Sequence, residues 1–112
     1  MSEFLQNCTR EDFLALLMEY ASNADMGMTD EAMDYIIKKV GHEAYKKADA
    51  HYKEHTDFEV LQDIIKLQSK FFPGENGRSE LHIYLMEFFY FDGEFTTMEL
   101  VFDQMLERLF VS

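Results

Sequence analysis

Apolar residues recur at helical spacing through most of the chain. After Thr9, a set of apolar side chains follows with steps of three or four residues, namely Phe13, Leu16, Leu17, Tyr20, Ala21 and Ala24. A second set follows Thr29 and contains Met33, Ile36, Ile37 and Val40, and Gly41 can end that helix. Such steps place side chains on one face of a helix, whereas strands would require alternation with a period of two. We find no sustained alternation, so the pattern predicts an all-α fold.

The next two helices are predicted with different degrees of burial. Residues 43–54 carry only a sparse apolar stripe (Tyr45, Ala48 and Tyr52), so we expect that helix to lie on the surface. Thr56 and Glu59 form a capping box, in which each residue bonds the backbone of the other. The helix that follows the box has an apolar face made of Phe58, Leu61, Ile64, Ile65 and Phe72.

Pro73-Gly74 and Asn76-Gly77 predict a loop, after which Ser79 should cap a helix that runs to Phe91. Residues 81–91 are apolar on nearly every side, which is typical of a helix at the centre of a bundle. We therefore expect Leu85 and Phe88 to be almost fully buried. Thr96 and Glu99 form another Thr-x-x-Glu box, before a last helix. The sequence predicts one domain over residues 1–112, a compact bundle of five to six helices.

Composition and charge narrow the functional classes. The 112 residues are 47% hydrophobic and carry 22 acidic against 10 basic side chains, a net charge of −12. This charge disfavours binding to nucleic acids and anionic membranes, and it favours a cation or a basic protein partner. No apolar run is long enough to insert into a membrane. A single cysteine, Cys8, and the absence of signal-peptide features predict a cytoplasmic protein, either a monomer or a homodimer.

Two segments share the same pattern 67 residues apart. Residues 20–31 and 88–99 each contain an apolar helix end, a turn with an aspartate (Asp25 or Asp92), an apolar residue and a threonine cap. These segments lie in the two most acidic parts of the chain. The pattern predicts a pseudo-duplicated helix–Asp turn–helix unit.

At these residues the sequence resembles the TerB-like tellurite-resistance family. That family repeats an apolar helix followed by Ala-x-Ala-Asp-Gly-x-hydrophobic-Ser/Thr-x-x-Glu. The segment from Asp92 to Glu99 fits the pattern from its aspartate onward, whereas the first copy has Met26 in place of glycine and Ala32 in place of glutamate. The resemblance implies a cytoplasmic, non-enzymatic helical module, active in stress response or tellurite resistance, that binds a divalent metal or docks onto other proteins.

The candidate metal ligands are the carboxylates of the two turns. If the turns converge, Asp25, Asp92, Glu94 and Glu99 could share a divalent cation such as calcium, which prefers oxygen ligands. An EF-hand does not fit, because Thr97 stands where its glycine is needed. The alternative is that these residues only cap helices and shape turns, since Thr96 and Glu99 form a capping box.

Other candidate chemistry is sparse. His51 and His55 share a helix face at a spacing that suits zinc, but no further ligands complete a site, so we expect solvated surface histidines. No nucleophile motif or phosphate-binding loop is present, so the sequence argues against an enzyme. The rival hypothesis is an acidic inhibitor or immunity-type protein that captures a basic partner protein.

Overall fold

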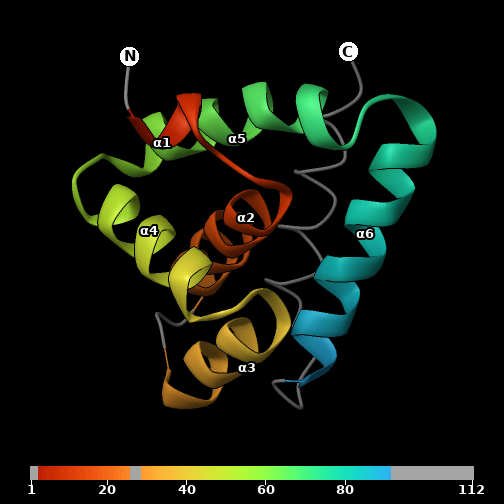
Figure 1. The fold of residues 1–112 in the computed structure, drawn as a ribbon. Helices are drawn as coiled ribbons and strands as arrows, with labels where there is room; N and C mark the ends of the chain where they lie inside the picture. Colours follow the sequence, from red (N-terminus) through yellow and green to blue (C-terminus); the bar gives the residue numbers. More distant parts are fainter. Residues whose placement is uncertain (1–2, 26–28, 92–112) are drawn as a thin grey trace.

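The predicted fold class is correct. The computed structural model describes residues 3–25 and 29–91, and this part of the chain forms six helices and no strand (Figure 1). The helices are α1 (Glu3–Gln6), α2 (Arg10–Asp25), α3 (Asp30–Val40), α4 (His42–Lys53), α5 (Asp57–Phe71) and α6 (Gly74–Phe91). The short helix α1 was not predicted, because four residues are too few to show a period.

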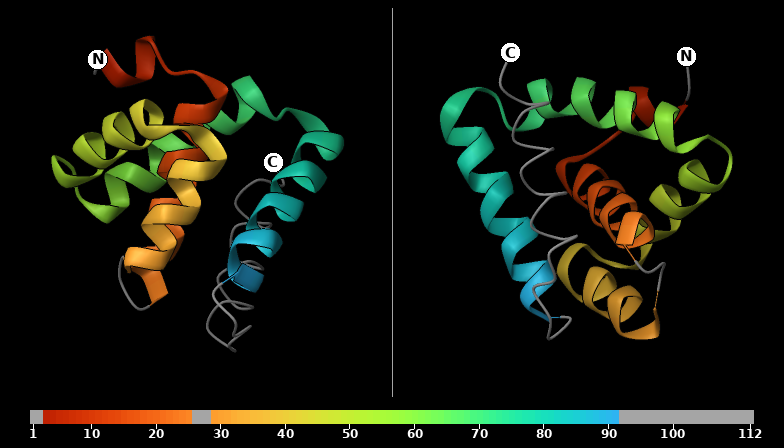
Figure 2. Two further views of the ribbon diagram at one scale, coloured as in Figure 1. Left: turned by 60° about the horizontal axis from the view of Figure 1, so that its bottom comes forward. Right: turned by 180° about the vertical axis from the view of Figure 1, so that it is seen from behind.

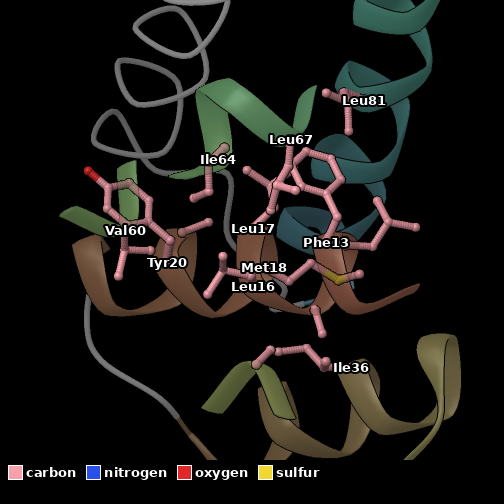
Figure 3. Close-up of a cluster of buried hydrophobic side chains, with 14 of the residues drawn as sticks. Phe13, Leu16, Leu17, Met18, Tyr20, Ile36, Val60, Ile64, Leu67 and Leu81 are labelled. Carbon is pink, nitrogen blue, oxygen red and sulfur yellow. The ribbon is translucent and has the colours of Figure 1, made fainter. Parts of the chain in front are cut away.

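Helix α2 is the centre of the bundle. It packs against α3, α4 and α5, and every residue from Asp12 to Ser22 is buried. Two views show α2 enclosed by the other helices (Figure 2). Ile36 of α3 lies on one side of α2, and Ile64 and Leu67 of α5 lie on the other (Figure 3). Leu81 of α6 completes the cluster.

The prediction that residues 81–91 form the buried centre is wrong. Leu81 of α6 is buried, but Ile83 is 56% exposed and Glu87 is also exposed. Helix α6 lies at the side of the bundle, where it contacts α5 (Figure 1). The side chains of Leu85 and Phe88, for which we expected burial, lie outside the described residues. An all-round apolar sequence therefore did not identify the central helix.

The predicted helix caps are correct for α2, α3 and α5. Thr9 and Asp12 bond each other's backbone, as do Thr56 and Glu59. Thr29 accepts a bond from the backbone N–H of Ala32. Gly41 ends α3 with φ of 97°, a backbone conformation that a residue with a Cβ rarely adopts. Each of the three threonine caps satisfies a backbone N–H that would otherwise lack a partner.

The predicted loop at residues 73–77 and the helix start at Ser79 are wrong. Helix α6 already begins at Gly74, directly after Pro73. Gly77 therefore lies within the helix, where a Cβ would collide with the backbone of Phe72. The glycine permits this close approach, which a loop interpretation does not require.

Residues 43–54 lie on the surface, as predicted, but one face of this helix packs more extensively than its sparse apolar stripe suggests. Helix α4 is a main packing partner of α2 and buries Ala44, Ala48 and His51. Small alanines let the two helices approach closely, so a sparse apolar stripe still forms a core interface. None of the helices in the described ranges combines the length and the apolar character that a membrane crossing requires.

Candidate functional site

The predicted cation site cannot be assembled from the described residues. Asp25 is the last residue of α2, and its side chain lies outside the described part of the chain, as do Asp92, Glu94 and Glu99 entirely. In residues 3–25 and 29–91, no three histidine, cysteine or acidic side chains are grouped to hold a metal. The cation site stays a prediction. A melting-curve titration with calcium of the wild type and of a variant with Asp92→Asn and Glu94→Gln would test it.

The prediction that His51 is a solvated histidine is wrong. His51 projects from the buried face of α4 and is only 5% exposed. Its Nε2 atom lies 2.7 Å from Oδ2 of Asp63 on α5. Because a carboxylate can only accept here, the imidazole donates, and the bond ties α4 to α5. The spacing of Ala44, Ala48 and His51 is the signal that would have placed His51 on the packed face.

His51 also holds an aromatic stack together. The ring of Phe4 from α1 lies 4.5 Å from its centroid, and the ring of His55 lies 4.2 Å from it. The Phe4 ring is stacked at 19° to the His51 ring, and the His55 ring is tilted by 32° to it. His55 is half-buried, and its Nδ1 donates to the backbone carbonyl of His51 over 2.7 Å. The stack joins α1, α4 and the turn after α4.

A cleft of about 520 Å³ opens beside this stack. Its lining residues come from α1 and the segment after it, the start of α2, and the C-terminal half of α4 with the following turn, and they are Phe4, Asn7, Asp12, Lys47, Ala50, His51, Glu54 and His55. We call it the histidine cleft. Asp12 is buried, and its Oδ2 accepts from Nζ of Lys47 over 3.0 Å and from the backbone N–H of Thr9 over 3.1 Å.

The first turn of α5 carries an exposed aromatic residue among acidic ones. Phe58 is 68% exposed, although the sequence placed it on the apolar face of its helix. That prediction is wrong, because the buried face of α5 consists of Val60, Ile64 and Leu67 with Gln68. Glu54, Asp57 and Glu59 are also exposed. We call Glu54, Asp57, Phe58 and Glu59 the acidic corner.

A second carboxyl group of α2 is buried with an acidic neighbour. Glu19 is 2% exposed and contacts Asp49 of α4, which also pairs with Lys53 over 2.9 Å. Burial raises the pKa of Glu19 to about 8, and the hydrogen bond to Asp49 adds to this rise. Burial acts to raise the pKa of Asp49 as well, but its bonds to Glu19 and Lys53 lower it overall. Glu19 therefore keeps its proton near neutral pH and donates a hydrogen bond through it to the ionised Asp49.

Cys8 shows no features of a nucleophile. Its thiol is buried and bonds the backbone carbonyl of Thr9 over 3.4 Å. Burial, followed by the negative charge of Asp12, raises its pKa to about 12, so the thiolate does not form near neutral pH.

Comparisons with known proteins found no relative of this chain. No family model, no curated protein and no solved structure matches the chain.

Proposed function

We propose that the protein is a non-enzymatic helical module of the TerB-like type that acts by binding a basic protein partner. The resemblance of residues 92–99 to that family extends the proposal to stress response or tellurite resistance. The observation that carries partner binding is the acidic corner, where Phe58 is exposed among three exposed carboxylates.

Phe58 takes no part in the packed face that α5 presents to the other described helices. The bundle buries α5 through Val60, Ile64 and Leu67, and Phe58 lies outside that face. Exposed aromatic residues with a charged rim are typical of binding sites, since they bury much area for little loss of side-chain entropy. A partner that covers Phe58 with an apolar side chain would remove that area from water.

The charge of the molecule selects the kind of partner. Several basic side chains are already paired within the chain, including Arg10 with Glu80, Lys39 with Glu87 and Lys47 with Asp12. The net charge of −12 is therefore available to attract or repel molecules that approach the protein. A negative surface attracts a basic partner and accelerates the encounter, especially at low salt.

The same family resemblance also implies a divalent cation as the ligand. A cation site would depend on the carboxylates of residues 92–99. Those residues lie outside the described part of the chain, so no geometry supports the cation as it supports the partner. The acidic inhibitor hypothesis requires the same surface and the same sign of partner charge, and identification of the natural partner would separate the two.

Calorimetric titration with a short synthetic peptide that alternates arginine and leucine tests this proposal. We expect binding that weakens when the salt rises from about 50 mM to about 300 mM NaCl. Phe58→Ser should weaken binding at least about fivefold. Ile83→Ser is the matched control, because Ile83 of α6 is also exposed but lies away from the acidic corner. Equal affinities of the two variants, or no binding at low salt, would refute the proposal.

A further inference from the structure

The histidine cleft has an aromatic wall. Phe4, His51 and His55 stack in series at 4.5 and 4.2 Å between ring centroids, and all three line the cleft. His51 is fixed by its bond to Asp63, and His55 by its bond to the carbonyl of His51. The wall is therefore held in place before any ligand arrives. In such a column only the end rings, Phe4 and His55, can offer a face to a further planar group. A preformed ring face favours a planar ligand group, because little ordering is needed on binding.

The polar groups of the cleft favour a cation. The charges of Asp12 and Lys47 offset one another at 3.0 Å. This leaves Glu54, which is exposed and which, within the described part of the chain, forms no ion pair. Glu54 caps the C-terminal end of α4, where the helix dipole is negative and attracts positive charge. Asn7 adds a carboxamide oxygen that can accept a hydrogen bond.

From this arrangement we propose that the histidine cleft binds the guanidinium group of an arginine side chain. The inference rests on the proposed function and names the group that the basic partner inserts. Guanidinium is planar, stacks on aromatic rings and can donate two parallel hydrogen bonds to one carboxylate. It would stack on the face of one of the end rings of the column and pair with Glu54. A lysine ammonium is a compact point charge that is attracted to an aromatic ring but does not stack on it as a planar group or pair with a carboxylate through two parallel bonds.

The cleft and the acidic corner are close enough for one peptide to occupy both. Glu54 belongs to both sites, and Phe58 follows His55 by three residues. Three residues span at most about 11 Å when fully extended. A basic segment could therefore place an apolar side chain on Phe58 and an arginine in the cleft. The partner chemistry is then an arginine-bearing peptide segment with an adjacent apolar residue.

The test compares three peptides of one length, in which leucine alternates with arginine, with lysine or with citrulline. Citrulline keeps the planar shape of arginine and lacks its charge. We expect the arginine peptide to bind wild-type protein at least about fivefold more tightly than the lysine peptide, and the citrulline peptide to bind most weakly. Glu54→Gln should remove most of the preference for arginine over lysine. Glu43→Gln is the matched control, since it removes an exposed charge from the other end of α4.

The outcomes separate the inference from the proposed function. Equal binding of the arginine and lysine peptides, or equal effects of Glu54→Gln and Glu43→Gln, would overturn the arginine site and leave partner binding at Phe58 intact. If Phe58→Ser has no effect on any peptide, the proposed function itself fails. Thermal melting of each variant confirms that the fold is retained, because Glu43 and Glu54 are both exposed.

Discussion

Helices α2 and α5 begin with the same cap but use the first turn differently. Thr9 and Thr56 are the cap residues, and each exchanges bonds with an acidic residue three positions later. The fourth helical position is fully buried in both, as Phe13 in α2 and Val60 in α5. The two helices thus enter the core in the same register.

The second helical position points to solvent in both helices, but it carries an acidic side chain in one and an aromatic side chain in the other. In α2 it is Glu11, an ordinary exposed acid, whereas in α5 it is Phe58. The register explains why Phe58 is exposed, since the position faces outward whatever residue occupies it. An aromatic residue at an outward position contributes little to the core, so its replacement should affect the proposed binding more than the stability of the fold.

The largest expected effect contrasts the two phenylalanines. Phe13→Ala should lower the free energy of unfolding by about 3–5 kcal/mol, because it leaves a cavity in the core beside Phe72. Phe58→Ala should change it by no more than about 0.5 kcal/mol. Urea unfolding followed by circular dichroism measures both. A cost above about 2 kcal/mol for Phe58→Ala would show that this residue is part of the core after all.

The next effect concerns the buried carboxyl group farther along α2. The pKa of Glu19 in the folded protein, about 8, lies above its ordinary value of 4.5. Its contribution to stability is therefore fully present below about pH 4.5 and is lost as the pH rises towards 8. This loss amounts to about 3 kcal/mol at pH 7, since each pKa unit corresponds to about 1.4 kcal/mol.

Glu19→Gln should remove that pH dependence and make the protein more stable than wild type at pH 7, because the amide can still donate to Asp49. Urea unfolding at pH 5 and pH 7 tests this, with Glu11→Gln as a control for the loss of a negative charge at an exposed position of α2. Identical pH profiles for wild type and Glu19→Gln would contradict a buried, protonated carboxyl group.

A smaller effect tests the caps on which the comparison depends. Thr56→Ala should cost about 1 kcal/mol, because the backbone N–H of Glu59 loses its partner. Glu59→Gln should cost much less, since glutamine completes the same box. Thermal unfolding of the two variants is sufficient. Equal costs would mean that the charge of Glu59, and not its hydrogen bond, matters at this position.

The sequence predicts the helices better than it predicts their places in the bundle. Caps at Thr9, Thr29 and Thr56 are local features, and the structure confirms them. The choice of central helix depends on packing between distant segments. Helix α2 is the central helix although it contains two buried carboxyl groups, and both have partners on α4, since Asp12 pairs with Lys47 and Glu19 bonds Asp49.

The site was less accessible to prediction for the same reason. The bond from His51 to Asp63 joins residues twelve apart on two helices, and nothing in the local pattern around Asp63 signals it. The exposure of Phe58 follows from the register of the cap, a signal that was present in the sequence. The apolar face predicted for α5 included the exposed Phe58 and left out the buried Val60.

The most direct test of partner binding is to map the arginine–leucine peptide on ¹⁵N-labelled wild-type protein by amide chemical shifts at low salt. We predict that the largest changes fall on residues 54–59 and on the histidine cleft around Asn7 and His51. Amides around Ile83 of α6, which is also exposed but lines neither site, should change little. Changes spread evenly over all acidic segments, with no concentration at residues 54–59, would contradict a specific docking site on the acidic corner.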